Sequence, residues 1–82
     1  MPEFIEVIPV ATERHYFSFR KNETASGVIF FIVTLEGNKA VSFEMKEQEK
    51  GVWKITTSAP EWIKRIEAKL SEAIRIRQDL RI

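Results

Sequence analysis

Residues 28–33 of the chain, VIFFIV, contain no polar side chain, and this run constrains the fold more than any other feature. Its β-branched and aromatic residues predict a strand inside a sheet. Gly37-Asn38 follows, which fits a two-residue hairpin turn, and beyond it apolar and polar residues alternate. Such a turn sets the pairing register and places Phe31 opposite Glu44. The chain is therefore expected to contain an antiparallel hairpin around this turn.

The two faces of the predicted hairpin differ in their surroundings. One face is apolar on both strands and carries Phe30, Ile32, Val41, Phe43 and Met45. The other face has polar residues on the second strand and an apolar stripe on the first, made of Ile29, Phe31, Val33 and Leu35. Complete burial of one such side chain is worth about 1.5–3 kcal/mol, so we expect both faces to be covered.

The rest of the chain predicts further strands and one helix. Alternation and β-prone residues predict strands at residues 3–10, 15–21, 28–36, 39–47 and 51–57. Ser58-Ala59-Pro60-Glu61 matches a capping box with a proline in the first turn, and the helical spacing of apolar residues after it predicts a helix over residues 59–80. The expected fold is α+β, an antiparallel β-meander of four to five strands followed by one long C-terminal helix packed on one face. With 82 residues, the chain is expected to form a single domain, residues 1–82.

Composition narrows the classes of function. The 13 basic and 12 acidic residues give a net charge of +1, which provides no overall attraction to nucleic acid or to an anionic membrane. The absence of cysteine excludes disulfides, thiolate nucleophiles and cysteine-based zinc sites. The first residues do not resemble a signal peptide, and no apolar run approaches the roughly 20 residues of a membrane span. We expect a cytoplasmic protein that does not enter a membrane.

The sequence offers little for catalysis. His15 is the only histidine, and we interpret it as a surface residue because no nucleophile or orienting partner can be assigned to it. The glutamates occupy alternating or helical surface positions, where they act as solvating charges. GxSxG, HExxH and phosphate-binding glycine motifs do not occur in the chain. We expect a protein that is not an enzyme and has no catalytic residue, metal site or cofactor.

A single helix covers one face of the sheet, so the second apolar stripe requires another cover. The N-terminal strand, long neighbouring side chains, a ligand, a protein partner or a second copy of the chain could supply it, and we favour the second copy. A helix of about 35 Å would also overhang a sheet about 20 Å wide and expose apolar residues at its end. The prediction is a small interaction module, homodimeric through the open sheet face and/or the helix end, with interface residues Ile29, Phe31, Val33, Leu35, Ile76 and Leu80.

The alternative is a module that binds single-stranded nucleic acid, and it depends on Trp53. Four loop residues after Lys46 would place Trp53 beside Phe31 on the open face, and one residue more would place it on the helix face. In the first case the stacking residues would be Tyr16, Phe31 and Trp53, and the phosphate-binding residues Arg20, Lys46 and Lys54.

The predicted order of strands and helix also resembles that of known single-strand binding proteins. The stretch from Lys50-Gly51-Val52 through Pro60-Glu61-Trp62 into the helix, after a four-stranded meander, is similar to the general plan of the Whirly, PUR and transcriptional-coactivator single-strand binding proteins. The resemblance implies a dimeric β4α module with single-stranded nucleic acid as its ligand.

Overall fold

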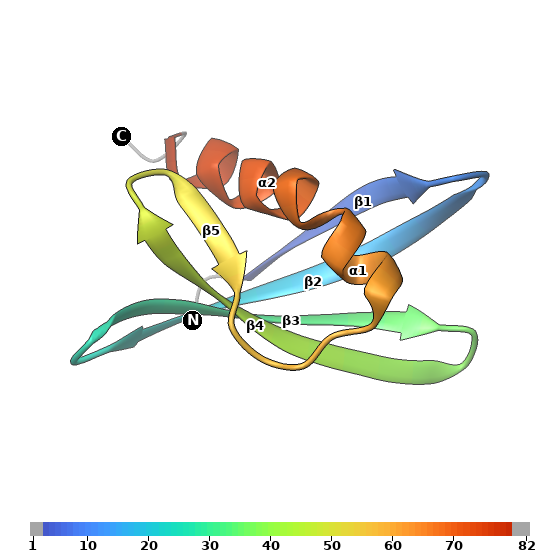
Figure 1. Ribbon diagram of the computed structural model, residues 1–82, viewed down its shortest axis with the longest axis horizontal. Helices are drawn as coiled ribbons and strands as arrows, with labels where there is room; N and C mark the ends of the chain where they lie inside the picture. The colour runs from blue at the N-terminus through green and yellow to red at the C-terminus, as the bar shows by residue number, and fades with distance from the viewer. Residues whose placement is uncertain (1–2, 80–82) are drawn as a thin grey trace.

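The computed structural model describes residues 3–79, which form a five-stranded antiparallel sheet and two helices (Figure 1). The strands lie in chain order and are β1 (Glu3–Val10), β2 (Glu13–Thr24), β3 (Gly27–Glu36), β4 (Lys39–Glu49) and β5 (Val52–Ile55). The helices that follow are α1 (Glu61–Arg65) and α2 (Glu67–Asp79). The expected α+β meander is confirmed, with five strands.

Two tight turns set the register of the sheet. Gly37, at φ 65°, allows the turn between β3 and β4, and Phe31 pairs with Glu44 as the sequence predicts. The turn between β1 and β2 holds two residues and closes on the pair Val10 and Glu13. Its first residue, Ala11, has a φ of 56°, which is uncommon for a residue with a side chain.

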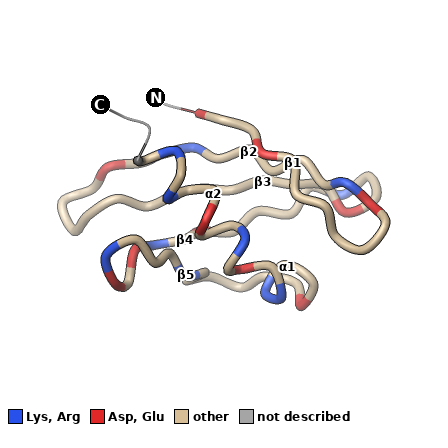
Figure 2. The backbone as a smooth tube through the Cα atoms, turned by 90° about the horizontal axis from the view of Figure 1, so that it is seen from above, with Lys and Arg blue, Asp and Glu red and all other residues tan. Residues whose placement is uncertain are grey.

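The core lies between one face of the curled sheet and the two helices. Its buried apolar residues are Ile8, Phe17, Phe19, Phe30, Ile32, Phe43, Met45, Trp53, Ile63, Ile66, Leu70 and Ile74. Helix α2 crosses this face from the β5 side, where Ser71 Oγ accepts the Trp53 backbone N–H, to the β1 side, where Arg77 Nε lies 3.4 Å from Glu6 Oε1 (Figure 2). The helices therefore cover one face of the sheet, as expected. No helix within residues 3–79 is long and apolar enough to cross a membrane.

The prediction of one long helix is wrong. Pro60, not Ser58, occupies the N-cap position, and no side chain caps this end. Ile66, at φ −105° and ψ 18°, then separates α1 from α2. Its N–H bonds to the carbonyl of Ile63 only three residues back, which tightens the turn and changes the direction of the chain. Ile63 on the short helix and Leu70 on the long one are both fully buried in the core.

The structure resolves the position of Trp53. Strand β4 continues to Glu49 through an irregularity after Glu47, and the Glu47 carboxylate accepts the Gly51 N–H at 2.7 Å. This register pairs Trp53 with Glu47, not with Glu44. Trp53 therefore points toward the helices, is 3% exposed, and packs edge-on against Phe30 at 5.1 Å between ring centroids.

The sheet divides into two ribbons at one end. Pairing between β2 and β3 stops at Ser18 and Val33, and beyond this point the β1–β2 and β3–β4 hairpins diverge (Figure 1). The Thr34 hydroxyl bridges the opening and donates to the Tyr16 carbonyl oxygen at 2.8 Å. This contact shows that the Tyr16 carbonyl points toward β3 rather than toward β1.

Candidate interaction surface

The face of the sheet opposite the helices carries large apolar side chains that remain exposed. We call them the open-face patch; they are 40% to 65% exposed and comprise Ile5, Val7, Tyr16, Phe31, Val33 and Leu35. The register places the patch on one face of three strands. Ile5 lies opposite Ser18, which lies opposite Val33, and Val7 lies opposite Tyr16. A group of large, exposed apolar side chains on one face is typical of an interaction site.

The structure groups only part of the expected interface. Three of the expected residues, Phe31, Val33 and Leu35, belong to the open-face patch, and Ile29 lies on the same strand face but is half-buried. Ile76 is 45% exposed but belongs to α2, which packs on the opposite face of the sheet. It therefore cannot form one continuous surface with the patch. Leu80 lies outside the described residues.

Two members of the patch, Ile5 and Val7, are not among the interface residues that the sequence predicts. Residues 4–8, FIEVI, are apolar at all but one position, so their alternation does not reveal which face they occupy. The signal that could have placed them is the two-residue turn at Ala11–Thr12. Counting back from its closing pair places Val7 opposite Tyr16, on the open face.

Charged residues of both signs lie beside the open-face patch. Arg20 Nε lies 3.1 Å from the Glu3 carboxylate at one side. At the other side Lys46 pairs in register with Lys54, whose ammonium lies 3.6 Å from the Glu67 carboxylate. A hollow of about 290 Å³ adjoins the patch and is lined by Phe31, Ser42, Phe43, Glu44, Thr57 and Ser58. The surface thus has an apolar centre and a rim of mixed charge.

The stacking platform of the nucleic-acid alternative is not assembled as predicted, because Trp53 lies in the core. Tyr16 and Phe31 do share the open face, and Arg20 pairs in register with Phe31. Lys46 and Lys54 lie opposite each other near the same face. Two aromatic rings and three cations of the predicted set therefore remain on or beside the open face.

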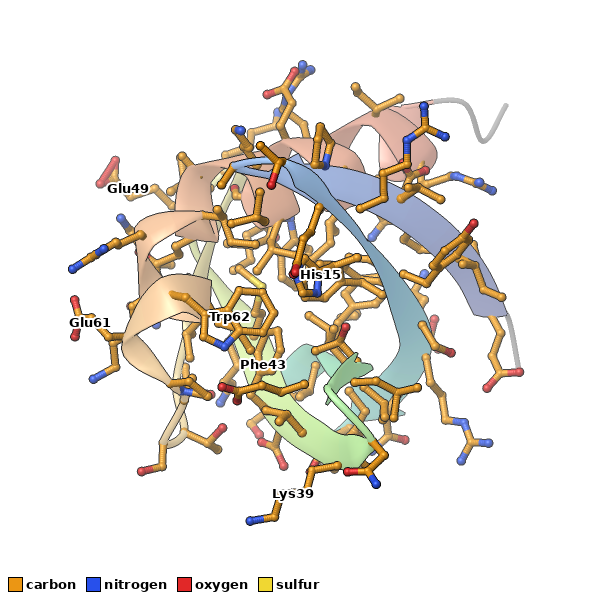
Figure 3. The ribbon with its side chains drawn as sticks, turned by 90° about the vertical axis from the view of Figure 1, so that its right-hand side faces the viewer. His15, Lys39, Phe43, Glu49, Glu61 and Trp62 are labelled. Atoms are coloured by element: carbon orange, nitrogen blue, oxygen red, sulfur yellow. The ribbon has the colours of Figure 1, made fainter. Side chains whose placement is uncertain are left out.

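A second hollow, of about 350 Å³, lies at the divided end of the sheet. His15 and Trp62 point toward one another there, with ring centroids 4.5 Å apart (Figure 3). His15, interpreted from the sequence as a surface residue, is partly buried: its side chain is 17% exposed, and its Nε2 lies 3.4 Å from the Glu13 carboxylate. The Trp62 indole N–H is buried and has no hydrogen-bond partner in the described part of the chain. The hollow also contacts Glu36.

The carboxyl group with a shifted pKa lies outside both hollows. The pKa of the Glu72 carboxyl is lowered, first of all by its hydrogen bond from Arg75, but this pair lies on the exposed side of α2. Within residues 3–79, no group of three His, Cys, Asp or Glu side chains is placed to hold a metal ion. The open-face patch is therefore the stronger candidate for a functional site.

Comparison of the chain with protein-family models, with curated protein sequences and with solved structures gives no match. The surface of the molecule is therefore the basis for inferring its function.

Proposed function

We propose that this chain is a non-enzymatic protein-interaction module that self-associates through the open-face patch. The observation that carries the proposal is the concentration of six large, exposed apolar side chains on one face. Isolated exposed apolar residues are ordinary on protein surfaces, whereas six large ones on the same face of a small sheet are not. A second copy packing face to face would remove this surface from water.

The charge around the patch favours a second copy as the occupant. Glu44 and Lys46 lie on the same face of β4, and the ion pair of Glu3 with Arg20 lies across the patch from them. Because the rim contains both signs, two copies related by a twofold axis can bring opposite charges together around the apolar centre. A partner of strongly single-signed charge would meet like charges somewhere on this rim.

The test is the molar mass in solution, measured by light scattering across concentration, for the wild type and for Phe31→Glu. A carboxylate at the centre of the patch would be buried without a partner, so we expect the variant to have half the mass of the wild type. Ile76→Glu is the matched control, because Ile76 is exposed to a similar extent but lies on α2.

Three outcomes would contradict the proposal. A wild-type protein that is monomeric at high micromolar concentration would exclude self-association. A folded Phe31→Glu variant with unchanged mass would exclude the open face as the interface. Dissociation by Ile76→Glu alone would place the interface at the helix end. Circular dichroism of each variant verifies that it is folded.

Single-stranded nucleic acid is the second candidate ligand, supported by one observation. Lys46 lies opposite Ile29 on the open face and makes no ion pair within residues 3–79, whereas Lys54 is already paired with Glu67. The Lys46 ammonium could contact a phosphate while Tyr16 and Phe31 stack on bases. An oligonucleotide titration tests the idea, and affinity that falls steeply with salt is expected if it is right. Absence of binding at low salt would exclude it.

A further inference from the structure

The outer edge of β1 presents backbone N–H and C=O groups toward solvent. The pairing of β1 with β2 shows which residues supply these outward groups. Pro9 pairs with Arg14 but has no N–H, so this pair cannot be one that exchanges two hydrogen bonds. Bonded and non-bonded pairs alternate, so Val7 with Tyr16 and Ile5 with Ser18 are also non-bonded pairs. The N–H and C=O groups of Ile5 and Val7 therefore point away from β2.

An independent contact supports this assignment of bonded and non-bonded pairs. The Tyr16 carbonyl accepts the Thr34 hydroxyl, so it points toward β3 and is not bonded to Val7. Among residues 3–79, no hydrogen bond is made to the backbone of Ile5 or Val7 from the outer side. Helix α2 reaches β1 only through side chains, with Arg77 contacting Glu6 and the ring of Phe4.

We infer that β1 pairs antiparallel with β1 of a second copy, around a twofold axis at Ile5, so that two sheets join into one. Ile5 then pairs with Ile5 of the second copy, and Glu3 pairs with Val7 on either side. This contact goes beyond the open-face contact proposed above and needs a different axis. If both contacts form, the assembly is larger than a dimer.

Among axes at Ile5, Glu6 and Val7, the chemistry of the strand favours the one at Ile5. With the axis at Ile5, the residues in bonded positions are Glu3, Ile5 and Val7, all of which carry an N–H. An axis at Glu6 or at Val7 would bring Pro9 into a bonded position and lose a donor on each strand. The axis at Glu6 would also place two Glu6 carboxylates directly opposite each other, which is unfavourable.

The same register is complementary in charge, which supports a second copy as the occupant. It places Glu6 opposite Phe4 of the other copy on the helix face of the sheet. In each copy the Arg77 guanidinium lies over the Phe4 ring, 4.6 Å from its centroid. Each Glu6 carboxylate would therefore lie near the Arg77 guanidinium of both copies. Negative and positive charges would then alternate across the twofold axis.

Single cysteines test this register, because the chain contains no cysteine of its own. Bonded antiparallel partners have Cα atoms about 5.5 Å apart, within the range of a disulfide, so Ile5→Cys is expected to cross-link to a second copy under mild oxidation. Val7→Cys is the matched control, since two copies of residue 7 would be more than about 13 Å apart in this register. Failure of Ile5→Cys to cross-link, or equal or faster cross-linking of Val7→Cys, would overturn the inference.

A proline provides the second test. Because the Ile5 N–H points outward, Ile5→Pro should leave the pairing of β1 with β2 intact while blocking the edge. Ile5→Thr is its control, because it loses a similar apolar side chain but keeps the N–H. We expect the dissociation constant of the edge contact to be at least about tenfold higher for Ile5→Pro than for Ile5→Thr. Equal values for the two folded variants would contradict edge pairing.

The double variant Ile5→Cys/Phe31→Glu distinguishes the open-face contact from the edge contact. Cross-linking that persists while the mass of the Phe31→Glu protein falls supports both contacts. Cross-linking with an unchanged mass leaves the edge contact standing and removes the open-face contact. A fall in mass without cross-linking by Ile5→Cys leaves the open-face contact and overturns the edge contact.

Discussion

The two outer strands of the sheet have the same kind of exposed backbone, but only one is covered. On β5, the outward N–H of Trp53 donates to Ser71 Oγ at 2.8 Å, and that of Ile55 donates to Glu67 Oε2 at 2.8 Å. On β1, the outward groups of Ile5 and Val7 have no such partner within the described residues. Unpaired strand edges are where sheets add further strands. The difference between the edges is therefore the basis for the inferred pairing of β1 with a second copy.

The covered edge also explains where the helix sits. Glu67 and Ser71 are one turn apart on α2 and face β5 together, while Leu70 between them is fully buried. One helix therefore supplies both apolar cover for the core and hydrogen-bond acceptors for the edge. Because α2 passes along β5 in this way, it meets β1 only near its other end, through Arg77.

The largest expected effect comes from loosening the helix that covers β5. Leu70→Ala removes a fully buried side chain, and we expect a loss of about 2–5 kcal/mol in the free energy of unfolding. Urea denaturation measures it, and hydrogen exchange of the Trp53 and Ile55 amides should accelerate. Lys69→Ala, at an exposed position of the same helix, should change stability by less than about 0.5 kcal/mol. A loss below about 1 kcal/mol for Leu70→Ala would show that the helix is not what covers this edge.

A smaller effect is expected when a single acceptor is removed. Ser71→Ala leaves the partly buried Trp53 N–H without its partner, which should cost about 1 kcal/mol. Ser71→Thr keeps a hydroxyl and serves as the control. In hydrogen exchange, the Trp53 amide should lose protection in the alanine variant while the Ile55 amide, bound to Glu67, keeps it. Equal loss at both amides would mean that the helix moves as a whole.

The strand order and the β3–β4 register were predictable because a two-residue turn leaves one pairing. The same reasoning fails at Trp53, whose face depends on one extra residue in β4 and on the contact of Glu47 with Gly51. Side-chain contacts of this kind act across a turn, and periodicity does not reveal them. The helix break at Ile66 has a similar origin, since no proline or glycine marks it.

The candidate surface was predictable to the extent that it follows from β3. Phe31, Val33 and Leu35 could be placed from the hairpin alone, whereas Ile5 and Val7 required the pairing of β1 with β2. Residues 4–8 are apolar on both faces, so local pattern does not assign their direction. The free edge of β1 could not be predicted either, because it depends on which strand the helix covers.

The smallest expected effect concerns the ion pair at the β5 end of α2, where Arg75 also lies beside Gly51 in the β4–β5 turn. The hydrogen bond from Arg75 lowers the pKa of the Glu72 carboxyl in the folded protein. The pair therefore stabilises the fold at pH values above the unfolded-state pKa of this carboxyl, and this contribution is lost as the pH falls through the folded-state pKa. Arg75→Gln should therefore raise the pKa of Glu72 in an NMR titration.

The accompanying stability difference between wild type and variant should be slight near neutral pH, because both side chains are exposed, and should shrink in acid. An unchanged pKa, or a stability difference that grows as the pH falls, would contradict this account. Cross-linking at Ile5→Cys should be unaffected by Arg75→Gln, since Arg75 lies beside Gly51 in the turn that leads into β5.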